Sequence, residues 1–85
     1  MPTLELLSRD GCGLCEEMQR ALEALRTRFP LPPVVVVDID SDPALQRRFI
    51  LEIPVLRLGG DVVCFGRLDE QGLLRALGTT RTSSE

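Results

Sequence analysis

The hydrophobic pattern of the chain changes its period twice before residue 40, and this constrains the fold more than any other feature. Residues 3–7 (TLELL) are mostly apolar and precede a turn-forming cluster, which predicts a strand. From Gly13 to Phe29 apolar residues recur at steps of three and four, which predicts a helix that a proline-rich segment then stops. Residues 34–39 (VVVVDI) are nearly all β-branched, which predicts a strand buried on both faces inside a sheet. The three segments together predict a βαβ unit.

The second half of the chain predicts a short helix, a hairpin and a last helix. Asp42 followed by Pro43 is a typical helix start, and the helix is expected to run to about Phe49. Residues 55–58 and 62–65 are expected to be strands, since glycines between them favour a tight connection. Asp69 can cap a last helix that is expected to stop at Gly78.

The predicted order is therefore β-α-β-α-β-β-α, an α/β fold with a compact sheet and helices on its faces. Residues 1–78 are expected to form one domain, and the polar residues 79–85 a disordered tail.

The composition excludes several classes of function. A net charge of −3 argues against sequence-independent binding to nucleic acid, which needs a basic face. No apolar stretch approaches the roughly 20 residues that span a bilayer, and the first residues lack the features of a signal peptide. A cytoplasmic protein that binds neither membranes nor nucleic acid is expected. The absence of histidine excludes a cysteine–histidine or serine–histidine nucleophile within this chain.

Cys12 and Cys15 stand where the first strand passes into the long helix. Residues three apart in a helical turn have Cα atoms about 5 Å apart, within the range that a disulfide accepts. Cys12 is expected to face unpaired backbone N–H groups at the helix start, which would stabilise its thiolate and lower its pKa. Cys15 should be less exposed. This arrangement predicts that Cys12 attacks a disulfide and Cys15 resolves the mixed disulfide.

Two other interpretations of the cysteines stay open. They can be inert apolar residues, or Cys12 can hold an iron–sulfur cluster between two subunits. A zinc site is disfavoured because Cys64 is only a third thiol and no histidine can be the fourth ligand. Cys64 itself is expected to pack inward from its strand, alternating with Val63, with a regulatory thiol as the alternative.

These residues resemble a small glutaredoxin-like member of the thioredoxin superfamily, over residues 2–78. The motif "CGLC" occupies the position of the active-site cysteines, "EIPVL" that of a cis-proline, and "FGRLDEQGLL" resembles the entry to the last helix of glutaredoxins. The resemblance implies a four-stranded mixed sheet with the first and third helices on one face and the second on the other.

The resemblance also implies further site residues. Cis-Pro54 would lie beside the disulfide, and the Ile53 backbone would pair with an extended peptide or glutathione. Gly13 and Leu14, between the cysteines, stand at positions that determine specificity in the family.

In the same way, Arg9, Gly66 and Asp69 match residues that hold glutathione in glutaredoxins. A trans proline, a turn glycine and a helix cap are the plainer interpretations of Pro54, Gly66 and Asp69.

The leading hypothesis is thus a thiol–disulfide oxidoreductase that acts on disulfide-containing proteins or glutathione mixed disulfides. We expect a monomer with no metal and no tightly bound cofactor, with glutathione as a co-substrate. The alternatives are a dimeric iron–sulfur cluster carrier and a binding module that keeps the fold without using its thiols.

Overall fold

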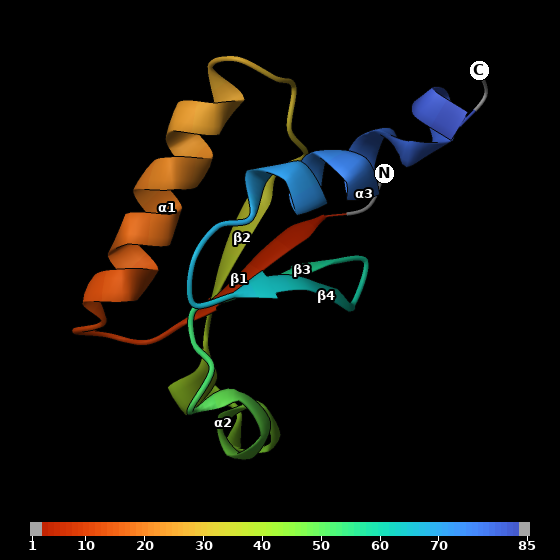
Figure 1. Cartoon of the computed structure of the whole chain (residues 1–85). Helices are drawn as coiled ribbons and strands as arrows, with labels where there is room; N and C mark the ends of the chain where they lie inside the picture. The colour runs from red at the N-terminus through yellow and green to blue at the C-terminus, as the bar shows by residue number, and fades with distance from the viewer. Residues whose placement is uncertain (1–2, 84–85) are drawn as a thin grey trace.

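A computed structural model describes residues 3–83, with side chains as far as Gly78, and shows a four-stranded mixed sheet flanked by helices (Figure 1). The elements are β1 (Leu4–Ser8), α1 (Gly13–Arg26), β2 (Val34–Asp38), a 3₁₀ turn η1 (Ile39–Ser41), α2 (Pro43–Phe49), β3 (Val55–Leu58), β4 (Asp61–Phe65) and α3 (Glu70–Ser83). The predicted order of strands and helices is confirmed. None of the helices in the described part of the chain is both long enough and apolar enough to span a bilayer.

The strands are ordered β2-β1-β3-β4 across the sheet. β1 and β2 are parallel, and α1 supplies the long crossover that a parallel pair requires. β3 runs antiparallel to β1, and β4 runs antiparallel to β3 through a hairpin. The central strands are therefore β1 and β3.

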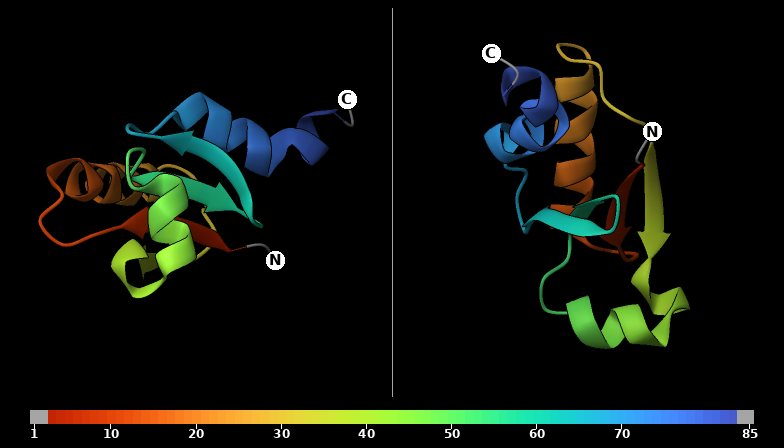
Figure 2. Two further views of the ribbon diagram at one scale, coloured as in Figure 1. Left: turned by 90° about the horizontal axis from the view of Figure 1, so that it is seen from below. Right: turned by 90° about the vertical axis from the view of Figure 1, so that its right-hand side faces the viewer.

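The helices cover the sheet in the predicted way, with α1 and α3 on one face and α2 on the other (Figure 2). Each face carries its own apolar cluster because side chains alternate along β1 and β3. Beneath α1 and α3 the buried residues are Leu4, Leu6, Met18, Leu22, Leu25, Leu56 and Leu73. Beneath α2 they are Leu7, Ile39, Phe49 and Val55.

The prediction that residues 34–39 form a strand buried on both faces is wrong. β2 is an edge strand that pairs only with β1, and Val35 and Val36 are 49% and 48% exposed. The two valines lie on opposite faces of the sheet, since neighbouring side chains alternate. A β-branched run indicates strand propensity, but whether the strand is central depends on how many strands lie beyond it.

β4 also departs from strict alternation. Leu56 pairs with Cys64 and Arg57 with Val62, so Val63 is an extra residue in a β-bulge. Because of the bulge, both Val63 and Cys64 pack against the α1/α3 cluster. The expected alternation of these two residues is therefore absent, although Cys64 does pack inward.

The predicted starts of the helices agree with the structure better than their predicted ends do. The Asp42 side chain accepts hydrogen bonds from the N–H groups of Ala44 and Leu45, as expected for a cap. The predicted stop at Gly78 is wrong, because α3 continues to Ser83. A glycine inside a helix lowers the stability of that helix by about 1 kcal/mol relative to alanine. It ends the helix only where its own backbone adopts the left-handed conformation. Of the tail predicted to be disordered, residues 79–83 belong to this helix and residues 84–85 lie outside the described part.

Candidate redox site

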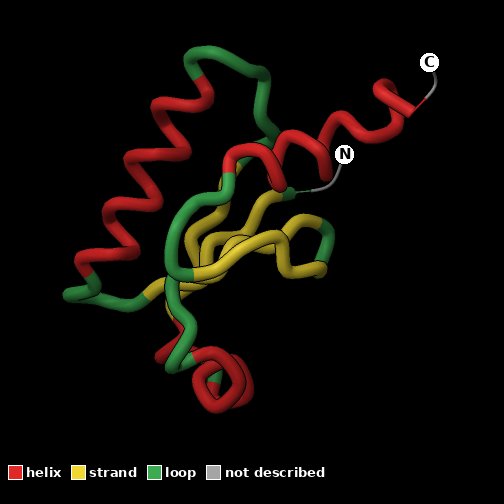
Figure 3. The backbone as a smooth tube through the Cα atoms, viewed as in Figure 1, coloured by secondary structure: helices red, strands yellow, loops and turns green. Residues whose placement is uncertain are grey.

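The segments that carry the predicted site residues leave the same end of the sheet (Figure 3). β1 and β2 are parallel and both end there, with Ser8 opposite Asp38. β3 begins at the same end, since Leu7 pairs with Val55, and β4 ends there with Phe65 opposite Val55. The loops that hold Cys12, Pro54 and Gly66 therefore adjoin three successive strands, β1, β3 and β4, at one end of the sheet.

Cys12 and Cys15 are joined by a disulfide, with their Cα atoms 5.2 Å apart. Cys12 is the N-cap of α1, and its Sγ accepts a hydrogen bond from the Cys15 N–H at 3.1 Å. Cys12 is half-buried, whereas Cys15, one turn further in, is only 2% exposed. The expectation that Cys15 is the less exposed of the two cysteines is confirmed.

The two residues between the cysteines face solvent in the first turn of α1. Gly13 is exposed, and a Cβ there would meet no atom within 4 Å. Leu14 is 46% exposed, which is unusual for a leucine in an amphipathic helix. This turn therefore presents a small apolar surface beside the disulfide.

The Ile53–Pro54 peptide bond is cis, as the resemblance implied. Pro54 is buried, and Ile53 is partly buried against the α2 cluster. The Pro54 carbonyl accepts a hydrogen bond from the Gly66 N–H at 2.8 Å, which ties the start of β3 to the end of β4. Gly66 has a φ of +79°, so the turn interpretation of this glycine is confirmed. A role in binding substrate stays a prediction for Ile53, Pro54 and Gly66.

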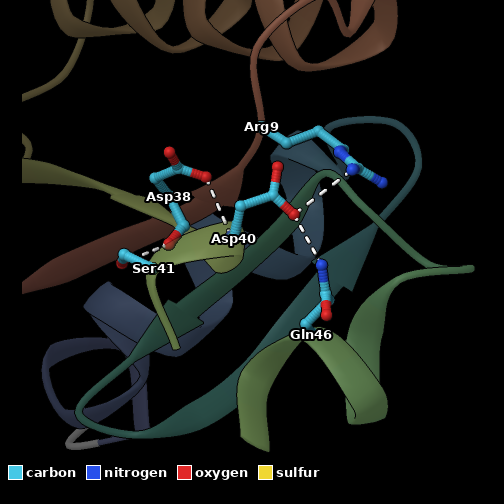
Figure 4. Close-up of polar contacts among 5 residues, drawn as sticks. All are labelled: Arg9, Asp38, Asp40, Ser41 and Gln46. Carbon is cyan, nitrogen blue, oxygen red and sulfur yellow. Dashed lines mark hydrogen bonds and ion pairs between the residues drawn. The ribbon is translucent and has the colours of Figure 1, made fainter. Parts of the chain in front are cut away.

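Arg9 begins the loop between β1 and α1 (residues 9–12, the redox loop), and its side chain does not stand free. Its Nη2 lies 3.2 Å from Oδ1 of Asp40, and the same Asp40 oxygen accepts a hydrogen bond from Gln46 Nε2 at 2.8 Å (Figure 4). Asp40 and Gln46 are not among the predicted site residues, because nothing in the sequence around them indicates this contact. The signal that could have found Asp40 is topological: the segments that follow two parallel strands emerge side by side, and Arg9 and Asp40 each follow one of them.

Asp69 acts as the cap of α3. Its Oδ1 accepts a hydrogen bond from the Gly72 N–H at 3.0 Å, and its carbonyl accepts one from the Leu73 N–H. A Cβ at position 72 would collide with the Asp69 carboxylate in its present position, so a side chain there would require that carboxylate to shift. The cap interpretation is confirmed, and a contact between Asp69 and a ligand stays a prediction.

Replacing Asp69 with alanine is expected to lower the free energy of unfolding by about 1 kcal/mol, because the N–H of Gly72 loses its acceptor. In a domain of this size that loss corresponds to a fall in Tm of about 4–8 °C, measured by circular dichroism. Asp69→Asn is the matched variant, since asparagine caps equally well and should leave Tm nearly unchanged. Equal Tm values for the alanine variant and the unmodified protein would contradict the capping role.

Cys64 is a free thiol, half-buried on β4. Burial raises the pKa of the Cys64 thiol above its ordinary value; a hydrogen bond with the Asp69 backbone partly lowers it, and the Asp69 charge raises it. Cys64 is therefore protonated at neutral pH and is a poor nucleophile. Its contacts are those of a packing residue.

Within residues 3–83, no three or more Cys, Asp or Glu side chains are grouped so that they could hold a metal ion. The thiols and carboxylates of a single chain therefore form no closed metal site in the described part.

Comparisons with known proteins agree with this geometry. A solution structure of protein Ne2328 from Nitrosomonas europaea superposes with a TM-score of 0.76 at 30% identity, covering 85% of this chain and 86% of that one. A thioredoxin mutant from Halobacterium salinarum gives a TM-score of 0.58 at 25% identity, over 92% of this chain and 73% of the other. Thioredoxin O1 from Arabidopsis thaliana in its oxidized state shares the fold at 20% identity, with a TM-score of 0.58 over 94% and 77% of the two chains.

Among curated proteins, a subunit of the anaerobic glycerol-3-phosphate dehydrogenase of Vibrio vulnificus is 36% identical over 70 residues. The match covers 82% of this chain but only 16% of that much longer protein. The model of the glutaredoxin-like domain (DUF836) matches residues 3–78, which is nearly the whole described fold and includes both redox cysteines. The fold and the cysteine pair support a redox-type function, and the chain belongs to the glutaredoxin-like domain family of the thioredoxin superfamily.

Proposed function

We propose that this protein is a thiol–disulfide oxidoreductase in which Cys12 is the nucleophile and Cys15 the resolving thiol. Its substrates are protein disulfides or mixed disulfides with glutathione. The observation that carries the proposal is the position of Cys12 at the N-cap of α1, with its sulfur accepting the Cys15 N–H.

The position of Cys12 favours a thiolate in the reduced protein. The first turn of α1 leaves backbone N–H groups without carbonyl partners in the helix, and one of them already points at Cys12 Sγ. These groups and the positive end of the helix dipole stabilise negative charge on that sulfur. Cys12 is also the more accessible of the two sulfurs, so an incoming disulfide meets it first.

The reaction then proceeds in two exchange steps. The Cys12 thiolate attacks one sulfur of the substrate disulfide, forms a mixed disulfide and releases the other sulfur as a thiolate. Cys15, after losing its proton, attacks Cys12 Sγ, closes the Cys12–Cys15 disulfide and releases the second substrate thiol. Two electrons pass from the dithiol to the substrate, and a small thiol or a second dithiol protein must reduce the disulfide again.

The proposal is tested by equilibrating the protein with graded mixtures of reduced and oxidised glutathione. Free thiols are then alkylated and counted by mass spectrometry. We expect the Cys12–Cys15 pair to change state reversibly with a midpoint near or below about −200 mV, the range of reducing members of this superfamily. Cys64 is expected to keep its thiol throughout, because it is half-buried and protonated.

Cys64→Ser is the matched control, and it should give the same midpoint with one fewer alkylated thiol. A pair that never forms a disulfide across the range would overturn the proposal. The cluster-carrier and binding-module hypotheses would then be the ones to test, the first by visible absorption after anaerobic reconstitution.

A further inference from the structure

Asp40 is held in place by contacts from several sides. Its backbone N–H donates to Oδ1 of Asp38 at 2.9 Å, and Ser41 Oγ donates to the Asp38 carbonyl at 2.6 Å, which fixes the turn η1 (Figure 4). Its Oδ1 then receives Gln46 Nε2 from α2 and lies beside Arg9 Nη2. The Asp40 backbone is thus tied to Asp38 at the end of β2, and its carboxylate is held by Gln46 of α2 as a counter-ion for Arg9.

Arg9 lies in the loop that leads from β1 to Cys12. It lies three residues before Cys12 and lines an open cavity of about 220 Å³ together with residues of the redox loop and α1. Among the described residues that line this cavity, Arg9 is the only cation, whereas Asp10, Glu16 and Asp38 are acidic. A guanidinium pairs well with a carboxylate, so Arg9 is the group in this cavity that a substrate carboxylate can use.

We infer that Asp40 is an internal competitor for Arg9 and makes the redox site discriminate against anionic disulfides. The inference rests on the proposed oxidoreductase function. An anionic substrate has to displace the Asp40 carboxylate from Arg9, whereas a neutral disulfide reaches Cys12 without breaking the pair. The side chains of Arg9 and Asp40 are each 37% exposed, so the pair can be displaced, and its strength is that of a partly solvated ion pair.

The experiment compares the protein with Asp40→Asn, which keeps the shape of the side chain and removes its charge. The first readout is binding of S-methylglutathione, an anionic probe that cannot be reduced, measured from NMR chemical shifts. The second is the ratio of kcat/KM for glutathione disulfide, which is anionic, to that for 2-hydroxyethyl disulfide, which is neutral. We expect Asp40→Asn to increase both the affinity and the ratio by about two- to fivefold, the range of a partly exposed ion pair.

Two further variants make the result specific. Asp61→Asn removes the same charge from the start of β4, at the other end of the sheet from the redox loop, and should change neither readout. When Asp40→Asn is added to Arg9→Gln, it should change neither readout, because the guanidinium for which Asp40 and the substrate compete is absent.

The inference is overturned if Asp40→Asn binds the probe no more tightly than the unmodified protein, including no detectable binding by either. It is also overturned if Asp61→Asn gives the same increase, since the effect is then one of net charge. Failure of the proposed function is distinguishable, because the unmodified protein would then not reduce the neutral disulfide either, while the binding measurement would still decide the role of Asp40.

Discussion

Replacing Cys12 with serine is expected to lower the rate of disulfide reduction by more than about a thousandfold, because the hydroxyl that replaces the attacking sulfur cannot form a mixed disulfide. Cys15→Ser keeps the attacking sulfur and loses the resolving one. It should therefore accumulate a mixed disulfide at Cys12, which appears in the mass spectrum as the protein plus one substrate thiol. The turnover of a small disulfide and the mass of the trapped species are the two measurements.

The control for these variants is Cys64→Ser, which removes a thiol from β4 and leaves the redox loop intact. It should retain the activity of the unmodified protein. Full and equal activity in Cys12→Ser and Cys15→Ser would show that neither sulfur takes part in the reaction.

Leu6→Ala is expected to lower the free energy of unfolding by about 2–5 kcal/mol, since it leaves a cavity in the centre of the sheet. Leu6 is fully buried on β1, among residues from α1, β3 and α3. The free energy of unfolding of a small domain is only about 5–15 kcal/mol, so this one substitution removes a large share of the stability. Urea denaturation followed by circular dichroism gives the difference between the two proteins.

Leu51→Ala is the matched control because the same atoms are removed from a side chain that is 95% exposed. Its effect should stay within about 0.5 kcal/mol. A loss of stability in Leu51→Ala equal to that in Leu6→Ala would contradict the assignment of the core.

The local features of the fold could be predicted from the sequence because each depends on neighbouring residues. The period of apolar residues identifies the helix from Gly13, and the dipeptide Asp42-Pro43 identifies the start of α2. The redox pair belongs to this group, since a spacing of three residues at a helix start suffices to bring two sulfurs together.

The features that could not be predicted depend on contacts between segments that are distant in the sequence. Residues 34–37 are four valines in succession, and nothing in them indicates that β2 has a neighbour on one side only. The bulge at Val63 depends on the register between β3 and β4. The pair of Arg9 and Asp40 joins residues 31 positions apart, which only the parallel pairing of β1 and β2 brings together.

The place of β2 at the edge of the sheet has a consequence for hydrogen exchange. Alternate N–H groups of β2 bond to β1, while the others point away from the sheet and meet water. The amide protons of this strand should therefore fall into a fast and a slow set that alternate along the chain. Its last residue, Asp38, accepts the Asp40 N–H, so the exchange rate of the slow amides at this end of β2 measures how firmly the strand anchors the turn that holds Asp40.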